Sequence, residues 1–437
     1  MNSHSHGRHR LARTPLLGAV AFALGSTVVL AGCAPTEAPA TGDPVTLTVW
    51  TWSNEAVAAF EDGIIDAFEE SHPGINVEIL AQLDKDYATL LTTGLAGSGG
   101  PDIAAIRSYG IINGFAESGS LTPIGDVVTD WSGFAESAIA GSTARFDGQV
   151  YAVPQGIQTA QVYYNKAIFK DLGLDVPETW DEFLEVSQEI KDAGISPIVI
   201  PGAAAPQISL AAEVLGNARR GGDEFANAFV AGDVTLTDPD NVAAIQLLAD
   251  IQPYLVDNVT SVTLDEAVTL FATGQVAMYP SGTWQVTTFA NLGADLDYGT
   301  FNVPVDKGWP SDSVTVSYAD GGWALSARTE HPEESAELLN WLASAEFANL
   351  YANKMGTIPA RDGVELDNPL LAEMYDRYLE NPAVYLGAAY LRYGSPSGTD
   401  VLGEQVQKIW LGQATSEQAA EAVQTGIDAW FNPADFK

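Results

Sequence analysis

The most informative stretch of the chain runs from Asp147 to Pro197 and reads DGQVYAVPQGIQTAQVYYNKAIFKDLGLDVPETWDEFLEVSQEIKDAGISP. It begins with an apolar run that ends at Pro154, continues through a polar patch containing Gln155, Gln158 and Gln161, and returns to an apolar run that ends at Tyr164. Short runs of β-branched and aromatic residues are typical of strands. We therefore expect a strand, a polar crossing point and a second strand here, followed by a short helix that opens at Asn165.

A second helix is predicted immediately afterwards. Thr179 and Glu182 have the spacing of a capping box, in which each side chain accepts a hydrogen bond from the backbone of the other. The residues that recur on one face of this helix are Trp180, Phe183, Leu184, Ser187 and Ile190. Gly194 is expected to end it, because glycine readily adopts the left-handed conformation found after helices.

The same alternation of strands and helices extends over most of the chain. Val45 to Trp52 alternates apolar and polar residues as a strand does, and a helical pattern through Phe60 and Phe68 separates it from a second strand at Ile75 to Leu80. A strand, a helix and a strand in this order predict a parallel pair in an α/β fold. Because single cores stop growing near ~250 to 300 residues, 437 residues predict two lobes.

The N-terminus has the features of an export signal. Three arginines, at 8, 10 and 13, precede an uncharged apolar run from Leu16 to Ala31 that is shorter than the ~20 residues of a spanning helix. Leu30 to Cys33 resembles the lipobox of bacterial lipoproteins, in which the cysteine thiol receives a diacylglycerol. We expect a signal peptide at 1–32 and a lipidated tether at 33–44. The alternative for Cys33, the only cysteine, is a small buried side chain.

The charge balance excludes several classes of partner. The chain has a formal net charge of −38, and loss of residues 1–32 would leave 16 basic against 57 acidic residues, a net charge of −41. Nucleic acid and anionic lipid surfaces would be repelled. Because the acidic residues are scattered, we expect a highly solvated surface, with salt adaptation or a cationic ligand as alternatives.

Residues for several kinds of catalysis are scarce. After residue 32 the chain keeps only His72 and His331, each directly before a proline, so a histidine-based triad or a structural zinc site is not expected. No metal or cofactor is predicted. Paired carboxylates are too abundant to be informative, and they leave a glycoside hydrolase open as an alternative.

Several segments of the sequence resemble the corresponding segments of one protein family. YAVPQG, VYYNKAIFKDLGL and PETWDEF in the opening stretch, FEESHPGINVEI at Phe68 to Ile79 and GQVAMYPSGTW at Gly274 to Trp284 resemble the extracellular solute-binding proteins of ATP-binding-cassette importers. The resemblance is to the carbohydrate-binding family that includes maltose-binding protein. It implies the two-lobed, type II periplasmic-binding-protein fold, in which each lobe is a mixed sheet flanked by helices and the ligand cleft lies between the lobes.

The resemblance also implies the course of the chain between the lobes. Three segments are expected to cross, near Gln155 to Thr159, Pro304 to Val314 and Ile358 to Asp362. The N-terminal lobe would then comprise residues 45–156 and 305–357, and the C-terminal lobe residues 157–304 and 358–437.

The candidate ligand-binding residues combine flat aromatic rings with polar groups. A sugar presents an apolar C–H face and a polar rim, which such a set can bind. By resemblance, Gln158 takes the place of a sugar-contacting glutamate and Trp284 that of a stacking tryptophan. The full predicted set is Trp52, Asn54, Glu55, Arg107, Ser108, Tyr109, Gln158, Trp284, Asp320, Trp323, Tyr390 and Arg392. Trp180, Trp341, Trp410 and Trp430 lie in helical patterns and are expected in the core.

The sequence thus predicts a monomeric receptor, anchored by lipid on Cys33 to the extracellular face of a bacterial membrane. It would bind a neutral mono- or oligosaccharide without altering it and deliver it to a permease. Two alternatives stay open: a binding protein for another solute, such as a peptide, polyol or cationic compound, and a secreted carbohydrate-active hydrolase.

Overall fold

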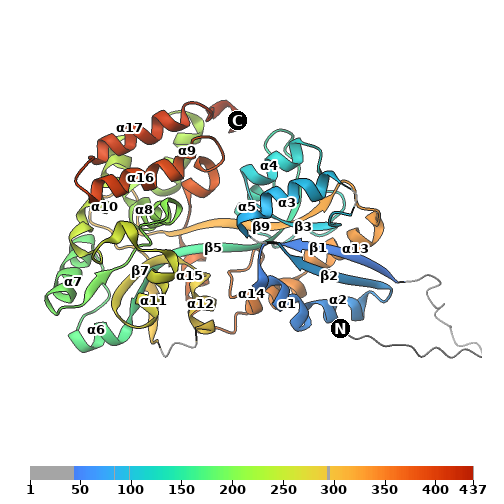
Figure 1. The fold of residues 1–437 in the computed structure, drawn as a ribbon, viewed down its shortest axis with the longest axis horizontal. Coiled ribbons are helices and arrows are strands. Elements are labelled where there is room, and N and C mark those ends of the chain that lie inside the picture. Colours follow the sequence, from blue (N-terminus) through green and yellow to red (C-terminus); the bar gives the residue numbers. More distant parts are fainter. Residues whose placement is uncertain (1–43, 83, 98, 293–295, 437) are drawn as a thin grey trace, which may run out of the picture. The chain divides into compact units, whose positions relative to one another are not determined.

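The computed structural model describes residues 44–82, 84–97, 99–292 and 296–436, and these lie in one compact unit. The predicted signal peptide, the tether up to residue 43 and Cys33 lie outside the described residues. Within them, the alternation of helices and strands expected from the sequence is confirmed (Figure 1).

The N-terminal group of elements is built from short strands with helices between them. It comprises β1 (Val45–Thr51), α1 (Asn54–Ala59), η1 (Phe60–Ile64), α2 (Ile65–Ser71), β2 (Ile75–Ala81), α3 (Asp84–Ala96), β3 (Ile103–Arg107), α4 (Gly110–Glu117), β4 (Leu121–Thr122) and α5 (Glu136–Gly141). The predicted long helix before β2 is divided, because Asp62 and Gly63 leave the helical conformation.

The long strand β5 (Ala152–Asn165) leads into the second group. That group comprises α6 (Lys166–Leu172), α7 (Trp180–Asp192), β6 (Ser196–Ile198), α8 (Ala205–Arg220), α9 (Gly222–Ala231), α10 (Pro239–Asp250), η2 (Gln252–Tyr254), η3 (Val259–Ser261), α11 (Leu264–Ala272), β7 (Val276–Gly282), α12 (Gln285–Asn291) and β8 (Tyr298–Phe301). The predicted capping box on α7 is confirmed, and the left-handed Gly194 follows the helix at φ 82°.

A second long strand, β9 (Thr315–Ser326), returns the chain to the first group. The remaining elements are α13 (Pro332–Leu342), α14 (Ala345–Met355), α15 (Pro369–Glu380), β10 (Pro382–Val384), η4 (Gly387–Leu391), α16 (Gly398–Trp410), α17 (Ser416–Ile427) and η5 (Pro433–Phe436).

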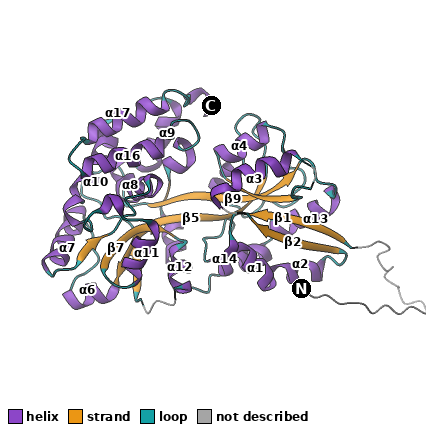
Figure 2. Ribbon diagram, in the orientation of Figure 1, coloured by secondary structure: helices purple, strands orange, loops and turns teal. Residues whose placement is uncertain are grey.

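One sheet path joins the two groups in the order β2-β1-β3-β9-β5-β7-β6. β1 runs parallel to β2 and β3, as the sequence predicts, whereas β9 is antiparallel to both β3 and β5. Helices cover both faces of the strands (Figure 2). β5 and β9 therefore lie side by side in the middle of the path, where β9 pairs with β3 and β4 of the first group and β5 pairs with β7 and β8 of the second.

Two large hydrophobic cores lie at opposite ends of this path. One packs Phe60 and Phe68 of the first group with Trp323 of β9, and the other packs Phe183, Leu215 and Met278 of the second group. Separate cores on one continuous sheet are the physical basis of the two lobes, because each group buries its apolar surface largely by itself.

The polar patch of the opening stretch does not break the strand. Gln155, Gln158 and Gln161 all lie within β5, and each is no more than 8% exposed. The prediction of two strands and a crossing point was wrong in this respect, because pairing with β9 continues past Gln155 and Gln158 to Ala160, and Gln161 then pairs with Ser281 of β7. The pairing with β9 is irregular between Pro154 and Ile157, where Gln155 of β5 and Asp320 of β9 are skipped.

Three chain segments lie where the groups meet. They are β5, β9 and the stretch near Ile358, whose backbone carbonyl accepts a 2.8 Å hydrogen bond from Ile157. β9 begins just after the predicted second crossing segment, residues 304–314, most of which form a loop. The predicted residue limits of the two lobes stay a prediction.

Candidate functional site

A cleft of about 470 Å³ lies over the middle of β5 and β9. The first group contributes Thr51, Trp52, Ser53, Glu55 and Arg107, and α14, which packs in the same core, adds Tyr351 and Met355. The second group contributes Gln207, Trp284, Thr287, Thr288 and Asn291. The two long strands supply the floor, with Gln155, Gln158, Tyr318 and Asp320. The lining thus combines residues from both groups and from the strands that connect them.

On the N-terminal side, a guanidinium group is held between an indole ring and a carboxylate. The Arg107 Cζ atom lies 4.4 Å from the centre of the Trp52 ring, and its Nη1 lies 3.5 Å from Asp320 Oδ1. Trp52 also packs edge-on against Tyr87 at 5.7 Å. Because Arg107 ends β3 and Trp52 follows β1, the parallel pairing of these two strands brings the side chains together.

The floor of the cleft links this cluster to the second group. Gln158 Nε2 donates a 3.3 Å hydrogen bond to Asp320 Oδ2, and the Thr283 hydroxyl donates to Gln158 Oε1. Thr283 directly precedes Trp284. Polar contacts therefore continue from Arg107 through Asp320 and Gln158 to the residue beside Trp284.

Trp284 is positioned by a glycine at the end of β7. A Cβ atom at Gly282 would lie 1.8 Å from Trp284 Cζ3, so the indole ring rests directly on the glycine. The ring lies at the start of α12, which presents Thr287, Thr288 and Asn291 to the cleft. The result is a flat apolar surface with hydroxyl and amide groups beside it.

Two tyrosines complete the cleft near Asp320. Burial, and secondarily the nearby Asp320 carboxylate, raises the pKa of both Tyr318 and Tyr351 well above its usual value. Both phenols are consequently neutral at physiological pH and keep a proton to donate.

Six predicted site residues line this cleft: Trp52, Glu55, Arg107, Gln158, Trp284 and Asp320. Their contact with a ligand stays a prediction. Asn54 is exposed at the first position of α1 and lies outside the lining, because Ser53 rather than Asn54 caps that helix.

Placing Trp323 in the cleft was wrong. Its side chain is fully buried and lies 5.3 Å from the ring of Phe60 in the N-terminal core. Side chains alternate between the two faces of a strand. Trp323 stands three positions after Asp320, so it faces away from the cleft.

Four further predicted residues lie outside the lining. Ser108 is buried, and Tyr109, at φ 62°, accepts a 3.0 Å hydrogen bond from the backbone N–H of Ala319. The Tyr390 ring lies near the Arg145 guanidinium group. Arg392 lies against the Tyr318 ring and donates a 3.2 Å hydrogen bond to the Tyr393 hydroxyl. These residues fill the junction between the groups on one side of the cleft.

The sequence reasoning missed much of the second group's contribution. The residues it missed are Thr51, Ser53, Gln155, Gln207, Thr287, Thr288, Asn291, Tyr318, Tyr351 and Met355. One signal was present: Trp284, Thr287, Thr288 and Asn291 have the spacing of one helical face, polar where a core helix would be apolar. Gln207 had no such signal, because it reaches the cleft only through the packing of α8.

A model of the family described as bacterial extracellular solute-binding protein matches residues 51–349. The chain belongs to this family. The matched range includes every residue of the cleft lining except Tyr351 and Met355, so most of the site of this solute-binding protein lies within the part of the chain that matches the family.

Individual relatives are more distant. The chain is 26% identical over 386 residues to a multiple sugar-binding protein of Streptococcus mutans, covering 85% of this chain and 88% of the relative. It is 24% identical over 415 residues to an sn-glycerol-3-phosphate-binding periplasmic protein of Salmonella paratyphi A, with coverage of 87% and 91%. Among solved structures, a chitin oligosaccharide binding protein superimposes with a TM-score of 0.74 at 23% identity, covering 89% of this chain and 99% of that one. The fold of a two-lobed solute-binding protein is therefore confirmed.

Across the described ranges, no three His, Cys, Asp or Glu side chains are grouped so that they could hold a metal ion. In the same part of the chain, every helix is too short or too polar to cross a bilayer.

Proposed function

We propose that this solute-binding protein is the extracellular receptor of an ATP-binding-cassette importer for a neutral mono- or oligosaccharide. The ligand would be captured between the lobes, held by hinge closure and delivered unaltered to a membrane permease. The observation that carries the proposal is the composition of the cleft: two tryptophans from opposite groups, with amides and hydroxyls between them.

This composition matches the chemistry of a sugar. The C–H face of a pyranose packs on flat aromatic rings, and its hydroxyls need donors and acceptors around the edge. Trp52 and Trp284 supply the rings, and Gln158, Thr287 and Asn291 supply amide and hydroxyl groups. The name of the Streptococcus mutans relative supports the same ligand class.

The charges of the cleft favour a neutral ligand over an anionic one. Its lining contains two carboxylates, Glu55 and Asp320, and one guanidinium group, Arg107, which already lies 3.5 Å from Asp320. A phosphate ester would meet net negative charge. We therefore favour a saccharide over the glycerol phosphate bound by the Salmonella relative.

Binding would be coupled to closure through the floor. A ligand that contacts Trp52 and Trp284 together stabilises the arrangement in which both lobes are near, so it shifts the equilibrium toward the closed state. The strands β5 and β9 are the segments that would bend. Lipidation of Cys33 would keep the receptor at the membrane, where a single acyl chain gives only weak attachment and two or more give stable anchoring.

A ligand screen tests the proposal. In a thermal-shift assay a saccharide at ~100 times its dissociation constant should stabilise the protein by ~2.7 kcal/mol, whereas sn-glycerol 3-phosphate should not. Trp284→Ala should abolish this stabilisation without lowering the melting temperature of the free protein by more than a few degrees. Stabilisation by the phosphate ester alone would contradict the proposal.

The hydrolase alternative requires a separate measurement. A transport receptor binds the ground state of its ligand, whereas an enzyme binds the transition state more tightly. Saccharides incubated with the protein for a day should be recovered intact by chromatography. Their cleavage, absent from a Trp284→Ala sample prepared in the same way, would favour the hydrolase.

A further inference from the structure

Gln155 occupies an unusual position on the floor of the cleft. Pro154 pairs with Gly322, Gly156 with Gly321 and Ile157 with Ala319, so the pairing skips Gln155 on β5 and Asp320 on β9 while the overall register is kept. Local irregularities of this kind change the direction of a side chain and are frequent beside binding sites. Gln155 and Gln158 both line the cleft here, although regular alternation would place them on opposite faces of the strand.

The carboxamide of Gln155 has one long hydrogen bond and an oxygen without a partner. Its Nε2 lies 3.5 Å from Asp320 Oδ2, at the limit of a hydrogen bond. Its Oε1 is buried and has no hydrogen-bond partner, and the whole side chain is only 7% exposed. The reverse orientation of the amide would place Oε1 against the Asp320 carboxylate, so Oε1 is the end of the amide that faces away from Asp320.

A buried acceptor without a partner costs free energy, and most such groups in proteins are satisfied. In the cleft the missing donor would come from a ligand. The amide of Gln155 lies with its Nε2 towards the Asp320 carboxylate, which is also an acceptor and already receives Arg107 and Gln158. This corner of the cleft therefore presents hydrogen-bond acceptors. It favours a ligand that carries donors over a ligand that carries only acceptors.

We infer that Gln155 is a specificity-determining residue: its Oε1 accepts a hydrogen bond from one free hydroxyl of the bound saccharide, next to Asp320. The inference rests on the proposed function and adds to it. It requires that the recognised sugar carry a free hydroxyl at this position, so a saccharide linked, methylated or deoxygenated there is rejected.

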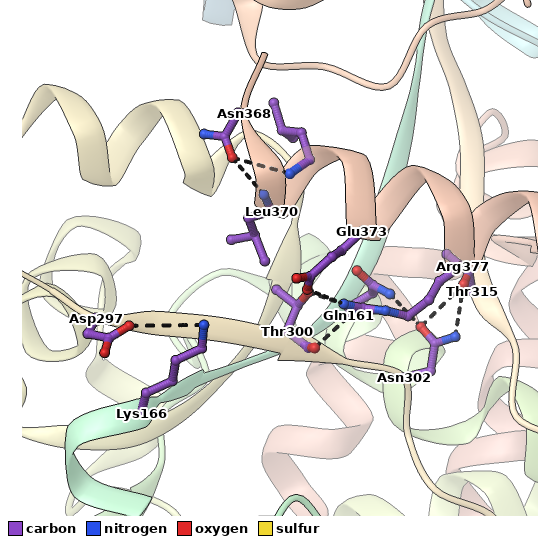
Figure 3. Close-up of polar contacts among 11 residues, drawn as sticks. Gln161, Lys166, Asp297, Thr300, Asn302, Thr315, Asn368, Leu370, Glu373 and Arg377 are labelled. Carbon is purple, nitrogen blue, oxygen red and sulfur yellow. Dashed lines mark hydrogen bonds and ion pairs between the residues drawn. The ribbon is translucent and has the colours of Figure 1, made fainter. Parts of the chain in front are cut away.

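Gln161 is a matched control on the same strand. It is fully buried, and its Oε1 also has no hydrogen-bond partner. Its Nε2, however, donates a 2.6 Å bond to Asn302, which in turn donates to Thr315, and it lies outside the cleft lining (Figure 3). It therefore shares the residue type, the strand and the burial of Gln155 without access to a ligand.

The test compares Gln155→Leu, Gln161→Leu and wild type by calorimetric titration. The ligands are the best saccharide of the thermal-shift screen and its series of monodeoxy analogues. Gln155→Leu should weaken binding of the parent sugar about tenfold, the value of one hydrogen bond. One deoxy analogue, and only one, should bind to the wild type and to Gln155→Leu with the same affinity. Gln161→Leu should bind every member of the series as the wild type does.

Two results would overturn the inference alone: unchanged affinity of Gln155→Leu for the parent sugar, or an equal loss for every deoxy analogue, which indicates a structural effect. If Gln155→Leu does not fold, Gln155→Met takes its place, because methionine keeps the length and volume of glutamine. A wild-type protein that binds no saccharide overturns the proposed function, and this inference with it.

Discussion

Gly282 shows how one residue without a side chain can determine the shape of a binding site. Because the Trp284 ring occupies the space where a Cβ would be, Gly282→Ala must displace the ring or the end of β7. We expect Gly282→Ala to weaken saccharide binding at least tenfold, as measured by calorimetric titration, while the circular dichroism spectrum stays that of the wild type.

Gly114 provides the control for this substitution. It lies in α4, and a Cβ there would meet nothing within 4 Å. Gly114→Ala should leave affinity unchanged and stabilise the free protein slightly, because alanine restricts the unfolded chain more than glycine does. Equal affinities of Gly282→Ala and Gly114→Ala would show that the position of the ring does not matter.

A buried ion pair in the second group gives a second prediction at the scale of single residues. Glu213 Oε2 lies 2.7 Å from Arg220 Nη2, and both side chains are at least nine-tenths buried. Glu213→Leu leaves the guanidinium charge buried without a carboxylate, which should lower the free energy of unfolding by about 3 to 5 kcal/mol in urea denaturation.

Glu373 and Arg377 form the exposed counterpart, 3.3 Å apart on α15 (Figure 3). Because solvent screens this pair, Glu373→Gln should cost less than about 1 kcal/mol. If Glu213→Leu also lowered the free energy of unfolding by less than about 1 kcal/mol, Arg220 would have to find another partner or reach water.

At the scale of elements, the capping box of α7 has a measurable share in stability. The Thr179 hydroxyl accepts from the Glu182 backbone and the Glu182 carboxylate accepts from the Thr179 backbone. Thr179→Ala removes one of these acceptors and should cost about 1 kcal/mol in urea denaturation. Thr92→Ala, at an exposed position inside α3, should change stability by no more than about 0.5 kcal/mol. Equal effects of the two substitutions would contradict a role for the cap.

The crossing strands are the elements on which the site depends most. β5 and β9 supply the floor of the cleft, and their mutual pairing is irregular at Gln155. β9 pairs with β3 and β4 of the first group, and β5 pairs with β7 and β8 of the second. Gly321 on β9 has a further role, because a Cβ there would lie 2.8 Å from the Trp52 ring and 2.5 Å from the Ile106 carbonyl oxygen. The same two strands can therefore serve as the hinge and as part of the binding surface.

At the scale of the whole molecule, the acidic composition predicts a response to salt. A formal net charge of −38 destabilises the compact state by self-repulsion, and the Debye length falls from ~30 Å at ~0.01 M salt to ~3 Å at ~1 M. We expect the melting temperature to rise steadily with sodium chloride over this range in differential scanning calorimetry.

The affinity for a neutral saccharide should stay constant to within about twofold over the same range of salt, because no ligand charge is screened. Calorimetric titrations at both ends of the range measure this directly. An affinity that falls strongly with salt would indicate a charged ligand and would contradict the proposed neutral saccharide.

The sequence by itself determined the α/β class, the capped helix at Thr179, the first strands and six residues that line the cleft. These follow from local periodicity, helix capping and the sequence motifs shared with the family, and each of these signals lies within a short run of consecutive residues. It did not determine that Trp323 is buried, that Gln155 projects into the cleft or that Gln207 reaches it. The face that a residue of β5 or β9 presents depends on an irregularity in the pairing of strands more than 150 positions apart, and the approach of α8 depends on core packing. Such long-range contacts exist only in the tertiary structure, because no short stretch of chain contains both partners.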